Sequence, residues 1–475
     1  MKLGDCVTLI RGTTYKSSLL SESDGPVLLG LGSIERHGGF KKGAWKHYPG
    51  SSSPDIILHP GDLYVSLKDL TQACDLLGAV ARVPKYLTEG RLTQDTVKLH
   101  FQNNASEQVR QYVYWSLRSP QYRAYCKARG TGTTNMSLSR KDFLDWEIPT
   151  KTKGRDTLVQ LLELIELKLA LNSRLNDHLA EMAMMLFDSE CPQANEPNAV
   201  LSDVAEITMG QSPSGSSYNE NGHGEVFYQG RGEFGSFFPR RHLFTTEPKR
   251  MAREGDILVS VRAPVGDLNI AAEDCCIGRG LAAIHSGSNQ SFVHYLMRAQ
   301  KRQLDTFNGD GTVFGSINGK ALKELSVYLP SNDGIAHLQS LLEPIDAMIR
   351  RNDDEMQALE QLRDALLPKL MSGEIDISRI DLRQLNGHLA AYPIWPERKP
   401  HPQQLLSEQF VMGASALKVG CIAIYAPDEK PIAGIGNMAF IASFPSARKP
   451  MHIVSVFEDL DGFGAVFQDK TNDCF

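Results

Sequence analysis

The sequence predicts an α+β protein: two globular mixed α/β modules joined by two long helices packed as an antiparallel coiled coil, plus a C-terminal extension. Three observations predict this class. The chain repeats itself, with a second copy beginning near residue 199. Each copy ends in a stretch with a seven-residue apolar repeat, which is typical of long helices that pair. The rest of each copy alternates short apolar runs with Gly-, Asn- and Ser-rich turns, which is typical of short strands.

The repeat divides the chain of 475 residues, which is long enough for several domains, into five expected segments. They are a first module over 1–150, a first spacer helix over 151–192, a second module over 199–331, a second spacer helix over 333–378 and a C-terminal extension over 379–475. The extension opens with a polar, Pro-rich stretch and continues with three strand-like apolar runs. Its role is not indicated by the sequence.

The two helical segments match each other without a gap. Eight residues of the first segment recur 180 positions later: Leu158, Leu161, Leu162, Glu163, Ile165, Asn172, Leu179 and Leu186 return as Leu338, Leu341, Leu342, Glu343, Ile345, Asn352, Leu359 and Leu366. The modules match more loosely, for example through Gly61-Asp62-Leu63 and Gly255-Asp256-Ile257. Each half of the chain is therefore a module followed by one long helix.

Every seventh residue of each segment, with apolar companions between, is predicted to form the core of a helix pair. The companions are Leu161, Leu175, Met182, Leu341, Met348 and Leu362. Antiparallel pairing would place Asn172 beside Asn352, where a buried polar pair would fix the register of the helices. In the alternative interpretation, each Asn faces solvent. Pro344 should kink or restart the second helix, and Pro368 should end it.

The formal net charge of −6 is unevenly distributed. Residues 2–150 hold 19 basic and 14 acidic side chains, both helical segments are acidic, and residues 201–330 hold 13 basic and 14 acidic side chains. A surface for nucleic acid in the second module must therefore be a local cluster of charge. No stretch approaches eighteen consecutive apolar residues, so we expect a cytoplasmic protein without membrane contact.

Arg, Lys, Gln and small polar residues in Gly-rich loops are the candidates for DNA contact, because Arg and Gln pair with base edges and Lys holds phosphate. In the first module they are Arg36, Lys41, Lys42, Lys46, Arg129, Thr133 and Arg140. In the second module they are Gln211, Ser212, Tyr218, Arg231, Arg240, Arg241, Arg262, Arg279 and Thr312. For any one of them, an ordinary solvated surface role is the competing interpretation.

The most distinctive stretches lie in the second half of the chain. They are GQSPSGSSYN (210–219), QGRGEFGSFFPRR (229–241), GDILVSVRAPVGDLNIA (255–271) and LRDALLPKLMSGEI (362–375). Together with the repeated module and helix, they resemble the specificity subunits of type I restriction-modification enzymes, over residues 1 to about 378. The resemblance implies two target recognition domains, at 1–150 and 199–331, in a non-catalytic subunit that reads a bipartite, asymmetric target in double-stranded DNA.

The resemblance also implies partners. Two adenine-methyltransferase subunits would dock on the helix pair, and two ATP-driven motor-nuclease subunits would join them to restrict unmodified DNA. S-adenosylmethionine, ATP and Mg would be bound by these partners, and the chain itself would need no cofactor. In line with this expectation, the sequence has no G-x-x-x-x-G-K-[ST] phosphate loop and no Cys or His at metal-ligand spacing.

Two other functions remain open from the sequence. The chain could serve a modification-only or other phage-defence methylation complex without a nuclease, or it could be a free-standing DNA-binding regulator that uses both modules as a clamp. Apolar residues expected on the outside of the helices count mildly against the regulator, because exposed patches usually mark contacts. These residues are Met184, Met185, Phe187, Leu366, Leu367 and Leu370.

Overall fold

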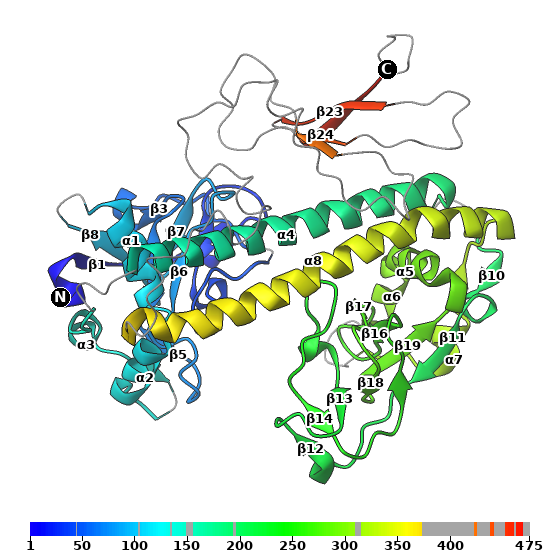
Figure 1. Ribbon diagram of the computed structural model, residues 1–475, viewed down its shortest axis with the longest axis horizontal. Helices are drawn as coiled ribbons and strands as arrows, with labels where there is room; N and C mark the ends of the chain where they lie inside the picture. Colours follow the sequence, from blue (N-terminus) through cyan, green and yellow to red (C-terminus); the bar gives the residue numbers. More distant parts are fainter. Residues whose placement is uncertain are drawn as a thin grey trace. The chain divides into compact units, whose positions relative to one another are not determined.

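The structure is a computed structural model, and it describes residues 1–43, 45–102, 105–133, 135–148, 155–192, 196–308, 315–372, 422–424, 438–440, 452–459 and 462–468. The chain divides into two units, Met1–Leu389 and Ala390–Phe475. The first unit contains both modules and both long helices (Figure 1). Its mixed content of helices and short strands agrees with the predicted α+β class.

The first module is built on two sheets. A four-stranded antiparallel sheet has the order β1 (Val7–Arg11), β8 (Thr96–Phe101), β4 (Leu63–Ser66) and β6 (Val80–Arg82). A second sheet has the order β2 (Val27–Leu29), β7 (Gly90–Leu92) and β3 (Ile57–Leu58). β5 (Lys68–Asp69) pairs with β9 (Met136–Ser137), and the helices are α1 (Glu107–Ser116), α2 (Pro120–Arg129) and α3 (Arg140–Leu144).

β4 divides the core of the first module because its side chains alternate between two faces. Leu63 and Val65 pack in the core that also contains Trp115 of α1, whereas Tyr64 packs in a second core with Leu29 of β2. All of these side chains are buried. A run of consecutive apolar residues therefore forms a strand with both faces covered.

The second module is built in the same way. A four-stranded antiparallel sheet has the order β11 (Glu206–Met209), β19 (Leu281–His285), β16 (Ile257–Ser260) and β17 (Leu268–Ile270). A five-stranded sheet has the order β12 (Tyr218–Asn219), β14 (Phe244–Thr245), β13 (Glu225–Tyr228), β18 (Cys275–Ile277) and β15 (Met251–Ala252). β10 (Ala199–Val200) pairs with β20 (Ser326–Val327), and the helices are α5 (Gln290–Ala299), α6 (Lys301–Asp305) and α7 (Gly319–Lys323).

The two modules share one strand topology. The order β1-β8-β4-β6 corresponds to β11-β19-β16-β17, and the parallel pair β2-β7 corresponds to the parallel pair β13-β18. In both modules the first residues pair with the segment that precedes the next long helix, through the bridge from Lys2 to Glu147 and through β10 and β20. The loose sequence repeat thus corresponds to a repeated arrangement of strands.

α4 (Arg155–Glu190) and α8 (Asn332–Ser372) lie side by side and run in opposite directions (Figure 1). Leu158, at the start of α4, packs in the same core as Leu367, near the end of α8. Phe187, near the end of α4, packs with Leu338, near the start of α8. Burial of one such side chain stabilises the fold by about 1.5–3 kcal/mol. Each module core therefore includes both long helices.

The predicted alignment of the two Asn residues is wrong by one helical turn. Asn352 Nδ2 donates a hydrogen bond to Asn176 Oδ1 at 2.7 Å, and Asn176 Nδ2 donates to Ile349 O at 3.1 Å. Asn172 Nδ2 instead donates to Glu355 Oε2 at 2.8 Å. Asn172, Asn176 and Asn352 are all buried, so none of them is a solvent-facing residue of a frayed seam.

The reason for the error is the choice of companion positions. The buried residues lie four positions after the heptad residues, at Leu162, Asn176, Ala183, Leu342 and Ile349. Several companions predicted three positions after them lie outside the seam: Met182 and Leu362 are exposed, and Leu175, Leu341 and Met348 are half-buried. The apolar period was therefore correct, but the face assigned to it was rotated.

Two further helix predictions are corrected. α8 runs through Pro344 and continues past Pro368 to Ser372, so Pro344 does not restart the helix and Pro368 does not end it. Each proline removes one backbone donor, which a helix packed along its length can tolerate. Phe187 and Leu367, predicted to be exposed, are 1% and 5% exposed because they pack into the module cores. Met185 is exposed as predicted, at 68%.

The second unit contains two antiparallel strand pairs among its described residues. β21 (Ile422–Ile424) pairs with β22 (Met438–Phe440), and β23 (His452–Asp459) pairs with β24 (Gly462–Gln468). The first three of these strands overlap the apolar runs from which strands were predicted. Across the whole described chain, the helices are all too short or too polar for a membrane span.

Candidate nucleic-acid interface

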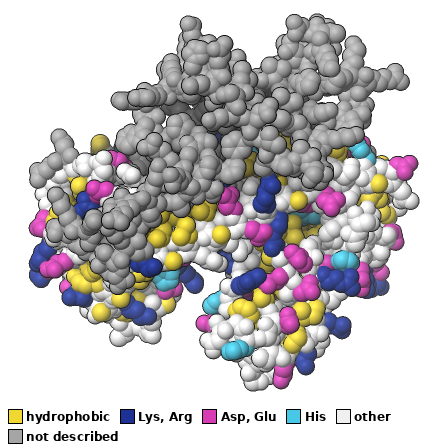
Figure 2. All heavy atoms as spheres, in the orientation of Figure 1, with side chains coloured by type: hydrophobic (Ala, Val, Ile, Leu, Met, Phe, Trp, Pro, Cys, Tyr) yellow, Lys and Arg dark blue, Asp and Glu magenta, His cyan; other side chains and the backbone are white. Residues whose placement is uncertain are grey.

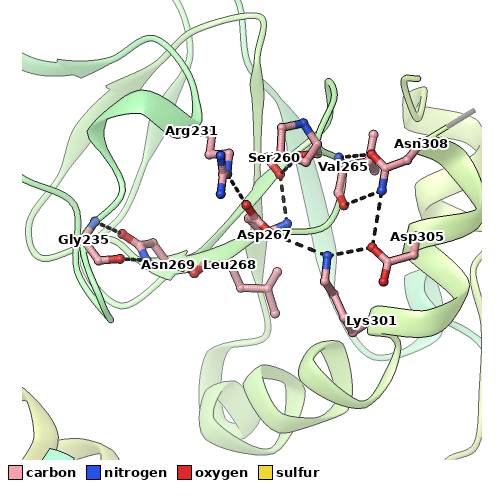
Figure 3. Close-up of polar contacts among 11 residues, drawn as sticks. Arg231, Gly235, Ser260, Val265, Asp267, Leu268, Asn269, Lys301, Asp305 and Asn308 are labelled. Atoms are coloured by element: carbon pink, nitrogen blue, oxygen red, sulfur yellow. Dashed lines mark hydrogen bonds and ion pairs between the residues drawn. The ribbon is translucent and has the colours of Figure 1, made fainter. Parts of the chain in front are cut away.

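The turn between β16 and β17 carries Arg262 and is fixed by its own hydrogen bonds (Figure 3). Ser260 Oγ donates to Pro264 O at 2.7 Å and accepts from the N–H of Asp267 at 2.9 Å. Gly266 has a φ of 87°, and a Cβ there would lie 2.6 Å from Leu304 Cβ, so the turn requires glycine at this position. The exposed Arg262 side chain therefore extends from a rigid base.

A second set of contacts ties this turn to the helices that follow it. Val265 N–H donates to Asn308 Oδ1 at 2.6 Å, and Asn308 Nδ2 lies 3.3 Å from Asp305 Oδ1 (Figure 3). Lys301 Nζ donates to the same Asp305 oxygen at 2.7 Å. The turn is thus stabilised by Ser260 from within and by Asn308 from the segment after α6.

Asp267, the last residue before β17, contacts two cationic side chains. Arg231 forms an ion pair with Asp267 Oδ2, and Lys301 Nζ lies 3.5 Å from Asp267 Oδ1 (Figure 3). Arg231 lies in the short 3-10 helix Arg231–Glu233, and its side chain is 55% exposed. Lys301 also pairs with Asp305, so the two cations and two carboxylates of this cluster balance in charge. The exposed side chain of Arg262, in contrast, has no ion-pair partner among the described residues.

Two glycine-containing loops bring further predicted residues to the same end of the sheet. Gln211 N–H donates to Ile277 O at 2.9 Å, and the backbone N–H and Nε of Arg279 lie 3.2 and 3.4 Å from Ser212 Oγ. Val261 N–H donates to Gly280 O at 2.9 Å, which joins the Arg279 loop to the strand that leads to Arg262. Backbone contacts therefore connect the loops of Gln211, Ser212, Arg262 and Arg279.

The remaining predicted residues of the second module lie around this cluster in other roles. Arg240 N–H donates to Glu233 O at 2.8 Å and its side chain is exposed. Arg241 forms an ion pair with Glu273. The Tyr218 hydroxyl donates to Pro213 O at 3.1 Å, and its ring packs 4.9 Å from that of Phe227, so Tyr218 braces its loop. Thr312 lies outside the described residues.

In the first module the structure separates the predicted residues into different environments. Arg36 is 81% exposed and lies 3.9 Å from Asp75, and Lys41 is exposed. Lys46 forms an ion pair with Glu22. Lys42 forms an ion pair with Asp177 of α4 and donates to Ser173 Oγ at 3.0 Å. The contacts of Lys42 therefore connect its loop to the long helix.

The second predicted cluster of the first module lies near the end of α2. The Arg129 guanidinium stacks 3.8 Å from the ring centre of Tyr125 and lies 4.0 Å from Asp142. Thr133 O accepts from Gln72 Nε2 at 2.7 Å, so the Gly-rich turn contacts the loop that follows β5. Arg140 is exposed at the first turn of α3.

The first module is anchored to α4 by half-buried charged groups and a buried tryptophan, of which the sequence analysis named only Glu163, as part of the helix repeat. Arg82 donates to both carboxylate oxygens of Glu163, at 2.7 and 2.6 Å, and Trp115 Nε1 donates to Glu163 at 2.7 Å. Burial alone would lower the pKa of Arg82, but the hydrogen bonds that it donates to Glu163 and the charges of both glutamates, Glu163 and Glu166, raise it. This arginine therefore serves the module–helix contact, not the exposed surface.

Two residues that bear on the interface were missed by the sequence analysis, namely Asp267 and Lys301. The sequence analysis assigned no role to either residue, because their closeness to Arg231 arises from the pairing of β16 with β17 and from the position of α6. The face of the second module visible in Figure 2 mixes Lys and Arg with Asp and Glu, as its near-neutral charge requires. Local geometry, not net charge, defines the candidate site.

Comparison with known proteins identifies the class to which this second half belongs. Residues 198–359 match the family model of the type I restriction modification DNA specificity domain. The chain is also 38% identical, over 174 residues, to a putative type I restriction enzyme MjaX specificity subunit of Methanocaldococcus jannaschii. That match covers 36% of this chain, and the chain spans only 41% of the relative's own length.

The chain therefore contains, over residues 198–359, a stretch similar to the type I restriction modification DNA specificity domain, as the resemblance predicted for this part of the sequence. Solved structures with similarity to it include a type I restriction-modification S subunit from M. genitalium, with 15% identity, a TM-score of 0.48, and coverage of 78% of this chain and 95% of that chain. Another is the HsdS subunit from Thermoanaerobacter tengcongensis, with 21% identity, a TM-score of 0.30, and coverage of 79% and 96%.

Proposed function

We propose that this chain is the non-catalytic DNA-recognition subunit of a type I restriction-modification complex and that it reads a bipartite, asymmetric target in double-stranded DNA. Each half-site would be read by one target recognition domain, at 1–150 and at 199–331. The observation that supports the proposal is the repeated module on an antiparallel helix pair, because two unlike copies of one reader suit two unlike half-sites.

In this proposal α4 and α8 form an antiparallel coiled coil that sets the distance between the half-sites. The heptad segments of about 29 residues would span roughly 43 Å at 1.5 Å per residue, which exceeds one turn of B-DNA. The loops of Gln211, Ser212, Arg231, Arg262 and Arg279 would form the reading face of the second domain. Arg262, with its planar guanidinium on a fixed turn, is the residue expected to contact a base edge.

The helix pair is also the proposed docking surface for two methyltransferase subunits. Leu167, Met182, Met185 and Leu362 are 41%, 43%, 68% and 41% exposed on α4 and α8, where apolar side chains are costly to leave in water. S-adenosylmethionine would belong to those subunits. ATP and Mg would belong to two motor-nuclease subunits in the complex that restricts DNA.

Mapping of methylated adenines in the host genome tests this function. Deletion of the gene should abolish methylation at one two-part motif with a gap of constant length, and re-expression should restore it. Methylation that is unchanged after deletion would refute the proposal. Loss of methylation without loss of restriction would favour the modification-only alternative, and sequence-specific DNA binding without any change in methylation would favour a free-standing regulator.

A further inference from the structure

The first module contains a turn built on the same framework as the turn of Arg262. Both turns follow a buried serine, Ser66 in β4 and Ser260 in β16, which are 0% and 1% exposed. Ser66 O accepts from the N–H of Gly78 at 2.7 Å, and Ser260 O accepts from the N–H of Gly266 at 2.9 Å. The two glycines have positive φ angles of 75° and 87°. The same hydrogen bond thus closes both turns.

The backbone after each serine continues the correspondence. Leu67 O accepts from the N–H of Leu138 at 2.9 Å, and Val261 O accepts from the N–H of Ile317 at 3.0 Å. In the first module, the residue after Leu67 is Lys68, which pairs with Ser137 in the β5–β9 ladder. The next residue of the second module is Arg262, which forms a bridge with Ser316.

Lys68 therefore occupies the place in the first module that Arg262 occupies in the second, although the two turns differ in length. A spacing of 194 residues, the same that relates Gly61-Asp62-Leu63 to Gly255-Asp256-Ile257, connects the two positions. Both residues are cationic, and Lys68 keeps 45% of its side chain exposed. A lysine at this place can hold a phosphate as a point charge but cannot form the paired hydrogen bonds of an arginine.

One neighbour distinguishes the two positions. Lys68 Nζ donates to Asp95 Oδ1 at 2.9 Å, and Asp95 is 28% exposed. Asp95 immediately precedes β8, and the corresponding position before β19 is Gly280, which carries no charge. The cation of the first module is therefore neutralised in the free protein, whereas that of the second module is not.

We propose that Lys68 binds the DNA phosphate backbone from the first module, at the place equivalent to Arg262, and that Asp95 competes with the phosphate for it. This inference rests on the proposed function. Binding would exchange the carboxylate of Asp95 for a phosphate oxygen, so the contact adds charge neutralisation of DNA while it discriminates little between bases.

The experiment measures DNA binding of the full-length chain by fluorescence anisotropy, over a series of KCl concentrations. The probes are a duplex of about 30 base pairs that carries the methylation motif and a scrambled duplex of equal length. The variants are Lys68→Ala, Asp95→Asn and the double variant, with Lys68→Gln in reserve should the alanine variant fold poorly. Lys2→Ala is the matched control, because Lys2 Nζ also donates to an aspartate, Asp145, at 2.9 Å in the same module.

Loss of one phosphate contact should reduce the slope of log affinity against log salt by about 0.9, which corresponds to roughly an eightfold loss of affinity at 0.1 M salt. Lys68→Ala should show this change on both duplexes, and Lys2→Ala should not. Asp95→Asn should raise affinity by about two- to fivefold, the worth of a half-exposed ion pair, and should have no effect in the double variant.

A purely structural ion pair would behave differently. Both single variants would then lower the thermal midpoint, and neither would change the salt slope, which would overturn the inference. The proposed function is judged separately by the wild-type chain, which must prefer the motif duplex to the scrambled one. Wild-type preference combined with an unchanged slope in Lys68→Ala would refute the role of Lys68 alone.

Discussion

Replacement of Asn176 by Leu should destabilise the pair formed by α4 and α8. The Asn176 side chain accepts a hydrogen bond of 2.7 Å from Asn352 and donates one of 3.1 Å to Ile349 O, and it is fully buried. The variant would leave the Asn352 amide group, which is 8% exposed, and the Ile349 carbonyl without these partners. Each unsatisfied buried group costs about 1–3 kcal/mol, so the two groups together cost about 4 kcal/mol at mid-range. A buried Leu returns about 2 kcal/mol, so we expect a net loss of roughly 2 kcal/mol.

Urea unfolding of the full chain, followed by circular dichroism at 222 nm, measures this loss as a fall in the midpoint. Gln357→Leu is the control, because Gln357 is exposed on α8 and also forms a side-chain hydrogen bond, of 2.8 Å to Asp353. The double variant Asn176→Leu/Asn352→Leu should recover most of the loss, since no side-chain amide then remains unpaired. A single variant as stable as the wild type, or a double variant no better than the single one, would refute the role of the pair.

Three further predictions concern the modules. Arg262→Ala should weaken binding to the second half-site by about 1–3 kcal/mol, without loss of partner subunits in gel filtration; equal affinity for motif duplexes would contradict the proposed reading face. Arg118→Ala should lower the free energy of unfolding by about 2–4 kcal/mol, because Arg118 is 8% exposed in its side chain and donates to Glu166 and Tyr114 at 2.7 and 2.9 Å; Lys141→Ala, an exposed ion-pair variant, is the control. Burial alone would raise the pKa of Asp69, but hydrogen bonds from the Leu76 and Thr71 N–H groups outweigh burial and lower the pKa. The contribution of Asp69 to stability is therefore complete above the usual carboxyl pKa near 3.8 and is lost as the pH falls through the lowered pKa. In an acid titration of stability, Asp69→Asn should remove this part of the pH dependence, and an unchanged profile would contradict the prediction.

The sequence was sufficient for those features that depend on periodicity. The gapless match of Leu158 and Ile165 with Leu338 and Ile345 predicted two long helices, and α4 and α8 are both present. It was insufficient for the face of each helix, because residues three and four positions from a heptad residue lie on nearly the same side. Only the contact of Asn176 with Asn352 reveals which set is buried.

The candidate site was predictable only in part. Arg231, Arg262 and Arg279 lie in glycine-rich loops, and loops of this kind are recognisable in a sequence. Asp267 and Lys301 depend on contacts between elements far apart in the chain, as does the pairing of Lys68 with Ser137. Lys68 could have been found from the weak repeat of Gly61-Asp62-Leu63 and Gly255-Asp256-Ile257. Counted seven residues on from Gly61 and Gly255, the same alignment places Lys68 opposite Arg262.

The anchoring of the modules connects the register of the helices to the proposed function. Tyr114 OH donates to Glu166 of α4 at 2.7 Å, and Tyr295 OH donates to Asp346 of α8 at 2.8 Å. Glu166 and Asp346 are related by the same interval of 180 residues as the heptads, so each module is attached at the same turn of its own helix.

The register contact between Asn176 and Asn352 therefore sets the separation of the two anchors. Glu166 lies ten residues before Asn176, and Asp346 lies six residues before Asn352 on the oppositely directed helix. At 1.5 Å per residue the anchors are about 24 Å apart along the helix axes. The alignment of Asn172 with Asn352 would reduce this separation to about 18 Å, a change close to two base-pair steps of about 3.4 Å. A slip of one helical turn would thus alter the gap in a bipartite target, and the buried amide pair opposes that slip.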